Sequence, residues 1–486
     1  MPDDVVSRFL QSSTAERLRM VREGRADGEL SAALGEAALE EYRRLASRSS
    51  RHLGSAAPRN VVFVPGVMGS LLMSRGLGGM WWIDVRTRSH IDDLRLAPDG
   101  TTDARREYDV VAITSDPSYE PFLAALLERD DLGHVTFAYD WRKPLAASAR
   151  AMADLLLRLY ADNGVPVHVV AHSMGGLMTR TTLALHWDEI KHAVGKIVFV
   201  GTPHYGSPAI AGYLKNHLWG FDVMAVLGRY ISRATFQSLW GVLELLPAPR
   251  GVYPGTRGDA GITWRSASSS DPYVHPCANF DLYDARAWDL HDEDASAAHL
   301  QRVLDGAAAQ HRRLFDSHRR LRQDVRDRML VIAGVGVKTL FRLAYDSRFL
   351  GLWERMERTT ALVPTDPHRN GDGRVPLASA ALEDVAIRYV HGVHGGLTNI
   401  PAVYEDVFRW LTDQPLLLPD TPAGALAGHL SASDRSEAPT LDGSSRAVGD
   451  DPGYWQDTPP DDATLTALEN TLADGRLPEF IRVRLL

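Results

Sequence analysis

The amino-acid sequence predicts an α/β fold, with a mostly parallel central sheet flanked by helices. The first observation is a series of near-continuous apolar runs that end in turn residues, the pattern of strands buried on both faces. The runs span residues 60–66, 134–141, 165–171, 196–200, 329–337 and 385–390. The second observation is that helical periodicity separates several runs, as in 119–128 and 145–160. Such βαβ units place reactive groups at the carboxyl ends of the strands.

The composition is that of a globular protein with a substantial core. Of 486 residues, 44% are hydrophobic and 24% are charged. The formal net charge of −9 provides no general attraction to nucleic acid, so we expect no nucleic-acid partner. The basic residues between 312 and 322 are typical of the solvated face of a helix.

Three features of the sequence favour the cytoplasm. The single cysteine, Cys277, cannot form an intramolecular disulfide, which favours a reducing compartment. Residues 1–10 include Asp3 and Asp4 and lack the basic-then-apolar pattern of a signal peptide. No stretch approaches the roughly 20 uninterrupted apolar residues of a membrane span. We therefore expect a cytoplasmic protein.

The chain divides into four parts by pattern. Residues 1–50 form an N-terminal helical segment, with two short helices between 12 and 47 that break near 24–28. The α/β core comprises 51–207 and 329–413, and it is interrupted by an insertion at 208–328. The first part of the insertion, 209–246, is helical and apolar, with Leu218, Trp219 and Phe221, which favours a cap over the sheet edge. An alternative is a helical subdomain that only packs.

The chain end has a different character. Residues 414–486 are expected to be a linker and C-terminal extension, because 415–461 is rich in Pro, Ser, Gly and Asp. The last residues, 463–486, have room for one helix and a short strand.

The segment 165–177 contains the strongest catalytic signal. An apolar strand leads into Ala171-His-Ser173-Met174-Gly175-Gly176, which matches the nucleophile elbow G-x-S-x-G except that Ala171 replaces the first glycine. Such a turn places the serine hydroxyl at a helix N-terminus, where N–H groups favour developing negative charge. We predict Ser173 as the nucleophile and the Met174 N–H as one oxyanion donor. The alternative is a serine that caps a helix.

Two later segments supply an acid and a base in the chain order of α/β-hydrolases, namely Ser, then Asp, then His. Asp372 lies in a glycine-rich turn, 370–376, and we predict that it orients and stabilises the imidazole. The base is His394, with His391 as the alternative base. His172 and His204 come too early in the chain. A structural turn with an incidental aspartate remains the alternative for Asp372.

Other ligand patterns are weak. Aligning Asn370 and Asp372 with a calcium loop puts His368 and Ser379 where carboxylates are needed. The run 334–339 lacks the spacing of a phosphate loop, and no zinc pattern occurs. We expect no metal and no cofactor.

The second oxyanion donor is expected in the glycine-containing turn after the first strand, 65–70. Gly66 and Gly69 allow the backbone to approach a substrate, and we predict the Val67 N–H as the donor, with Met68 as the reserve.

Five segments together resemble one family. They are 63–70 (FVPGVMGS), 139–142 (YDWR), 171–176 (AHSMGG), 201–207 (GTPHYGS) and 371–376 (GDGRVP). In this order they resemble the lecithin:cholesterol acyltransferase-like branch of the α/β-hydrolases, which includes phospholipases A and phospholipid:diacylglycerol acyltransferases. The resemblance covers 60–411. It implies the triad and oxyanion roles given above and a membrane-active cap.

These features predict a serine esterase or lipase. Its expected substrates are carboxylic esters, lipid or phospholipid acyl esters above all, cleaved through an acyl-enzyme on Ser173. The first alternative is an acyltransferase that passes the acyl group to an alcohol. An alternative of another class is a non-catalytic interaction or effector module. Expected partners are a lipid or small ester substrate, a membrane surface in transient contact with the cap, and a protein at the terminal segments.

Overall fold

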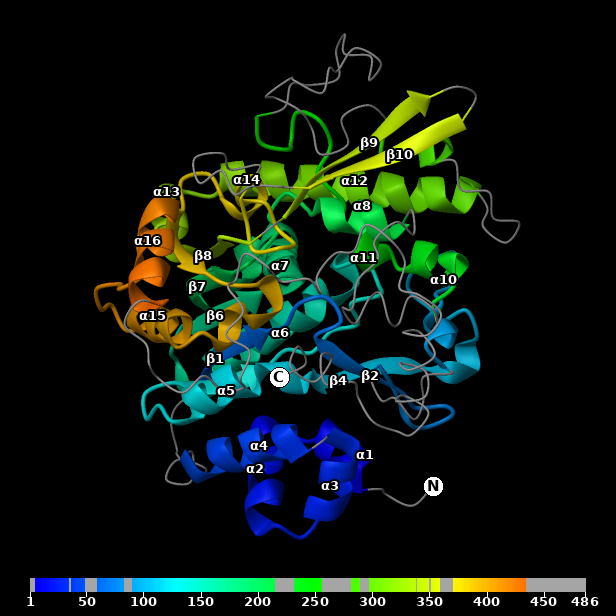
Figure 1. Ribbon diagram of the computed structural model, residues 1–486. Helices are drawn as coiled ribbons and strands as arrows, with labels where there is room; N and C mark the ends of the chain where they lie inside the picture. Colours follow the sequence, from blue (N-terminus) through cyan, green and yellow to red (C-terminus); the bar gives the residue numbers. More distant parts are fainter. Residues whose placement is uncertain are drawn as a thin grey trace.

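A six-stranded parallel sheet forms the centre of the molecule (Figure 1). The computed structural model describes residues 5–34, 36–48, 59–82, 90–214, 231–255, 281–288, 297–337, 339–348, 351–358 and 370–433. The strands, in spatial order, are β11 (Ala386–His391), β8 (Met329–Val335), β7 (Val194–Val200), β6 (Val167–His172), β1 (Arg59–Val64) and β5 (Gly133–Thr136). Every neighbouring pair is parallel. The predicted fold class is confirmed.

The strand order creates the crevice where a site is expected. From β1 the chain goes outward to β5, returns to β6 on the other side of β1, and then continues through β7 and β8 to β11. The order therefore reverses between β1 and β6, and the carboxyl ends at such a switch point form a ligand crevice. In the register of this pair, Val64 is opposite Ala171, so the segments that follow both strands begin side by side.

Helices cover both faces of the sheet. Along β1, Val62 and Val64 pack into one core with α6 (Ala146–Asn163) and α7 (Met174–Ile190). Val61 and Phe63 pack into the other core with α5 (Glu120–Leu127) and α15 (Pro401–Leu411). This alternation follows from the period of two along a strand, and it explains why the strands read as continuous apolar runs.

The insertion is only partly described. Its helices are α8 (Pro208–Leu214), α10 (Arg233–Ser238), α11 (Trp240–Leu243), η6 (Ala285–Trp288), α12 (Ala297–Arg320) and α13 (Gln323–Arg326). Helix α12 packs against α7 and α11, so the insertion is built onto the core. The residues that suggested an apolar cap, Leu218, Trp219 and Phe221, lie outside the described residues. None of the helices that the structure describes is long and apolar enough to cross a bilayer.

Smaller elements complete the description. A three-stranded antiparallel sheet contains β3 (Met80–Trp82), β2 (Ser70–Ser74) and β4 (Val110–Ser115), and a hairpin joins β9 (Leu340–Arg348) to β10 (Gly351–Arg358). Short helices are η3 (Asp92–Leu94), η4 (Arg106–Tyr108), η5 (Pro117–Tyr119), α14 (Leu377–Ala380) and η7 (His394–Asn399). Neither antiparallel element was predicted.

Two predictions about the chain ends are wrong. The N-terminal segment contains four helices, α1 (Val5–Gln11), α2 (Thr14–Glu23), α3 (Asp27–Leu34) and α4 (Glu36–Arg48), not two. The break at Gly24 is present, where a left-handed residue ends α2. The supposed linker begins with a helix, α16 (Pro422–Ser433), which packs on β11 and β8. Its first turn is capped by the Thr421 hydroxyl, which accepts from the Gly424 N–H at 3.2 Å. Residues 434–486 lie outside the described residues.

A buried arginine attaches the N-terminal helices to the core. Arg17 of α2 forms an ion pair with Glu120 of α5 at 2.5 Å, and both side chains are buried. The same guanidinium donates to the backbone carbonyls of Phe9, Leu10 and Ser115. Leu18 of α2 shares an apolar cluster with Leu71 of β2. The N-terminal helices are therefore packed onto the α/β core.

We expect Arg17→Met to lower the free energy of unfolding by about 3–5 kcal/mol, because it leaves the Glu120 carboxylate buried without its partner. Chemical denaturation of the whole chain measures this. The control is Arg43→Met, which removes the partly exposed ion pairs of Arg43 with Asp27 and Glu36 and should change stability little. Equal losses in the two variants would contradict a stabilising role for the buried Arg17–Glu120 pair.

Candidate active site

Ser173 lies on a sharp turn between β6 and α7. Its backbone has φ 53° and ψ −125°, a strained conformation for a residue with a side chain. The neighbouring glycines make the turn feasible. A Cβ added to Gly175 would lie 2.3 Å from the Val64 carbonyl oxygen, and one added to Gly176 would lie 2.1 Å from the Thr202 hydroxyl. The turn therefore has the packing of a nucleophile elbow.

Three side chains that are far apart in sequence form a continuous hydrogen-bonded series. The His394 Nε2 lies 2.9 Å from the Ser173 Oγ, and its Nδ1 lies 2.8 Å from the Asp372 Oδ2. Since a carboxylate only accepts, Nδ1 carries the proton and Nε2 is left to accept from the serine hydroxyl. The arrangement can thus move a proton from Ser173 to His394. The structure brings together the three predicted residues, and their catalytic roles stay predictions.

Backbone contacts hold the acid and the base in place. The Asp372 Oδ1 accepts from the amides of Arg374 and Val375, at 2.9 and 2.8 Å. The His394 N–H donates to the Asp372 carbonyl at 2.8 Å. Gly334, at the end of β8, leaves room for the acid, because a Cβ there would lie 2.6 Å from the Asp372 Cβ. The glycine run that superficially suggested a phosphate loop therefore makes space for Asp372.

The turn after β1 lies directly against the serine. A Cβ added to Gly66 would lie 2.9 Å from the Ser173 Cβ. In the part of the chain that the structure describes, the amides of Val67 and Met174 have no hydrogen-bond acceptor. Unpaired donors beside a nucleophile are what an oxyanion needs. Met68, the reserve donor, has a positive φ of 61°.

Aromatic side chains fix this turn. The Tyr139 hydroxyl donates to the Pro65 carbonyl at 3.1 Å, and the Trp141 Nε1 donates to the Ser70 carbonyl at 3.1 Å. Trp82 donates to the Met68 carbonyl at 2.8 Å. The motif at 139–142 therefore supports the turn at 65–70.

Sequence reasoning missed one contributor to the site, Tyr119. Its hydroxyl accepts from the Gly66 N–H at 3.0 Å and lies 2.9 Å from the Nδ1 of His172. Nothing in the local sequence distinguishes Tyr119 from a core aromatic residue. Burial, and then the proximity of His394, lower the pKa of His172 to about 3, so His172 is neutral at pH 7.

Partly buried His168 and buried His172 both make stability depend on pH. Burial lowers the pKa of His168 to about 4, and that of His172 is about 3. Below pH 6.5 the two imidazoles are protonated in the unfolded chain and remain neutral in the folded chain. The free energy of unfolding therefore falls as pH falls. At pH 5 we expect a loss of about 2 kcal/mol per histidine relative to pH 7.

Denaturation at pH 7 and pH 5 measures this loss. His168→Asn keeps an acceptor for the Lys196 N–H, which now donates to the His168 Nδ1 at 2.9 Å, and should remove one histidine's share of the change. An unaltered pH dependence in this variant would contradict the assignment.

The alternative base, His391, lies elsewhere. A Cβ added to Gly336 would lie 2.4 Å from the Cδ2 of His391 and 2.8 Å from Leu426 of α16. The imidazole of His391 is therefore packed at the end of β8 and β11, whereas that of His394 contacts Ser173.

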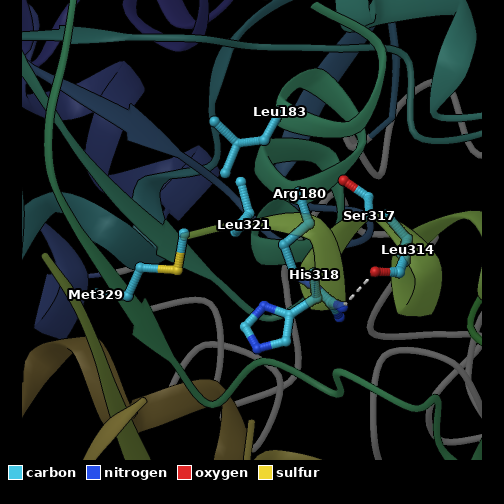
Figure 2. A pocket seen from close by; sticks show the side chains of 7 residues that line it. All are labelled: Arg180, Leu183, Leu314, Ser317, His318, Leu321 and Met329. Carbon is cyan, nitrogen blue, oxygen red and sulfur yellow. Dashed lines mark hydrogen bonds between the residues drawn. The ribbon is translucent and has the colours of Figure 1, made fainter. Parts of the chain in front are cut away.

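A small cavity of about 10 Å³ lies between α7, α12 and β8, away from the predicted site residues (Figure 2). Arg180, Ser317 and His318 contribute polar groups, and three leucines and Met329 line the rest. The guanidinium of Arg180 donates to the Leu314 carbonyl at 3.1 Å, and burial lowers its pKa to about 10. The volume suits a single water molecule and not an ester substrate.

Comparison with known proteins finds similarity to one family. The family model described as Lecithin:cholesterol acyltransferase matches residues 128–296, which include Ser173 and Met174. Two proteins of Arabidopsis thaliana are similar. Phospholipase A(1) LCAT3 is 25% identical over 283 residues, which is 52% of this chain and 59% of the relative. Lecithin-cholesterol acyltransferase-like 4 is 23% identical over 300 residues, which is 57% and 54%. Over these ranges the chain is similar to the lecithin:cholesterol acyltransferase-like branch of the α/β-hydrolases.

The similarity to this family covers only part of the chain. The chain spans between half and two thirds of the length of these two relatives, and the family match ends before Asp372 and His394. A solved structure titled the Tle4–Tli4 complex has a TM-score of 0.46 at 14% identity, and the alignment covers 79% of this chain and all of that one. The family model and the two Arabidopsis relatives confirm the predicted resemblance to the lecithin:cholesterol acyltransferase-like branch.

Proposed function

We propose that this chain is a serine hydrolase that cleaves carboxylic esters of lipids through an acyl-enzyme on Ser173. The observation that carries the proposal is the series Ser173–His394–Asp372, with 2.9 and 2.8 Å between successive side chains, at the end of a strained strand–turn–helix segment. A serine hydroxyl is a poor nucleophile unless a base takes its proton, and this series supplies an oriented base.

The proposed acylation step is as follows. The Ser173 Oγ forms a bond to the ester carbonyl carbon while its proton moves to the His394 Nε2. Negative charge develops on the carbonyl oxygen and is stabilised by the amides of Val67 and Met174. The carbon–oxygen bond to the alcohol then breaks, and His394 gives its proton to the departing alcohol.

Deacylation repeats the sequence with water. His394 takes a proton from a water molecule, the water oxygen attacks the acyl carbon, and the Ser173 Oγ leaves with the proton from His394. An acyltransferase differs only here, since an alcohol takes the place of water. We keep acyl transfer as a second candidate function, because the matching family model is described as an acyltransferase.

Lipid esters are the proposed substrate class. The relatives are named a phospholipase A(1) and a lecithin-cholesterol acyltransferase-like protein. The insertion also contacts the site, because a Cβ added to Gly241 of α11 would lie 3.0 Å from the Met174 side chain. The apolar side chains of α11 beside the oxyanion donor suit an acyl chain.

Labelling with a fluorophosphonate tests the proposal. This probe reacts with activated serines, and mass spectrometry locates the adduct. We expect one adduct, on the peptide that contains Ser173, and hydrolysis of a p-nitrophenyl ester and of phosphatidylcholine by the same preparation. No adduct and no turnover would favour the non-catalytic interaction module. Transfer of the acyl group to an added long-chain alcohol in preference to water would favour the acyltransferase.

A further inference from the structure

Two buried side chains connect the turn at 65–70, which contains the proposed oxyanion donor, to the backbone of His394. The Gly66 N–H lies 3.0 Å from the Tyr119 hydroxyl, which lies 2.9 Å from the His172 Nδ1. On the far side of the ring, the His172 Nε2 lies 3.0 Å from the carbonyl oxygen of His394. Tyr119 and His172 are both nearly inaccessible to solvent. We call them the positioning pair.

Every proton in this connection has one allowed place. A carbonyl oxygen only accepts, so the His172 Nε2 carries the hydrogen that faces His394. In the neutral ring the Nδ1 then accepts, and the Tyr119 hydroxyl must donate to it. The phenol oxygen is left to accept from the Gly66 N–H. Each hydrogen bond in the series has one possible donor and one possible acceptor, and none of these groups is left unpaired. Such a fully satisfied buried network is rigid.

The connection ends on the two segments whose separation matters most for ester cleavage. His394 is held by its backbone on both sides, with its N–H on the Asp372 carbonyl at 2.8 Å and its carbonyl on His172. Gly66 directly precedes Val67, the proposed oxyanion donor. The Ser173 oxygen must reach the ester carbonyl carbon while the Ser173 proton moves to His394. At the same time the carbonyl oxygen of the ester must reach the Val67 amide.

Each member of the pair is also held by its place in the fold. His172 precedes Ser173 at the end of β6. Tyr119 ends η5 and precedes Glu120, which pairs with Arg17 of the N-terminal helices. The Tyr119 ring also packs edge-on against Phe63 of β1, with 4.9 Å between ring centroids.

We infer that Tyr119 and His172 are positioning residues, which hold the His394 imidazole and the Val67 amide at the separation that the tetrahedral intermediate requires. The inference rests on the proposed function. It assigns no proton transfer with substrate to either residue, because both nitrogens of His172 are engaged away from the Ser173 hydroxyl.

Two substitutions of His172 separate positioning from packing. The amide nitrogen of glutamine occupies the place of Nε2 and keeps a donor for the His394 carbonyl, whereas the asparagine amide occupies the place of Nδ1 and loses that donor. We expect His172→Asn to lower kcat roughly 10- to 100-fold, with KM within about twofold, because a small displacement of the base affects the chemical step. His172→Gln should recover most of that loss. Equal kcat values in the two variants, each folded by circular dichroism, would overturn the inference.

Tyr119→Phe tests the contact of the positioning pair with Gly66. It also provides the test of the inference if His172→Asn does not fold. It keeps the ring and removes the hydroxyl, so the Gly66 N–H loses its acceptor. We expect kcat and the rate of fluorophosphonate labelling to fall at least about tenfold. The matched control is Tyr108→Phe, which removes a buried hydroxyl 3.2 Å from Asp93, away from the site, and should leave both rates unchanged.

The outcomes distinguish the inference from the function on which it rests. A wild-type chain that neither reacts with the probe nor turns over ester removes the proposed function. An active wild type with an equally active Tyr119→Phe variant leaves the function and removes the positioning role.

Discussion

Replacing Ser173 with alanine should lower kcat for a p-nitrophenyl ester roughly 10⁶-fold and abolish the fluorophosphonate adduct. In the proposed mechanism this hydroxyl is the only group of the protein that bonds to the substrate carbon, and it lies 2.9 Å from the His394 Nε2. Without it, Val67, Met174 and the binding surface can contribute only the residual acceleration that oxyanion donors supply.

The fold should survive this change, since alanine only removes an oxygen and leaves the turn at Ser173 intact. Steady-state rates and thermal unfolding of both chains measure the two quantities. Ser47→Ala, at the exposed end of α4, is the control for handling and purity. Turnover retained in Ser173→Ala within tenfold of wild type would show that another nucleophile does the chemistry.

Asp372→Asn should lower kcat roughly 10⁴-fold. The asparagine oxygen can still accept from the amides of Arg374 and Val375, so the turn keeps its shape. Its NH₂ group then faces the His394 Nδ1, which must become an acceptor. The ring proton moves to Nε2, on the side that faces Ser173. Nε2 then has no free lone pair and cannot accept the proton of the Ser173 hydroxyl.

The same reasoning separates the two candidate bases. His394→Gln should reduce kcat about as far as Asp372→Asn does, whereas His391→Gln should change it by less than about threefold. The structure places the His391 ring beside Gly336 and the His394 ring between Ser173 and Asp372. A large loss in His391→Gln, in a chain that remains folded, would contradict this placement.

Some of the site could be predicted because its signals are local. The elbow depends on residues within three positions of Ser173, and the steric reason is visible at Gly175, where any side chain would collide with the Val64 carbonyl. The strands of the central sheet could be predicted because burial on both faces leaves continuous apolar runs. The hairpin β9–β10 and helix α16 were missed, since their sequences mix apolar and polar residues without a clear period.

The remainder of the site depends on strand order. Ser173 and His394 are separated by 221 positions and meet only because β6 and β11 belong to the same parallel sheet, with the carboxyl ends of their strands at one edge. Tyr119 reaches Gly66 and His172 across 53 positions on each side. No local pattern encodes such contacts.

The sequence by itself determined the fold class, the family resemblance and the serine, because each follows from short-range pattern and steric demand. The tertiary structure alone decided which histidine meets that serine, that the N-terminal helices are held to the core through Arg17, and that Tyr119 and His172 join the two halves of the site. These are long-range contacts, and their geometry exists only after the sheet has assembled and the side chains between its layers have packed.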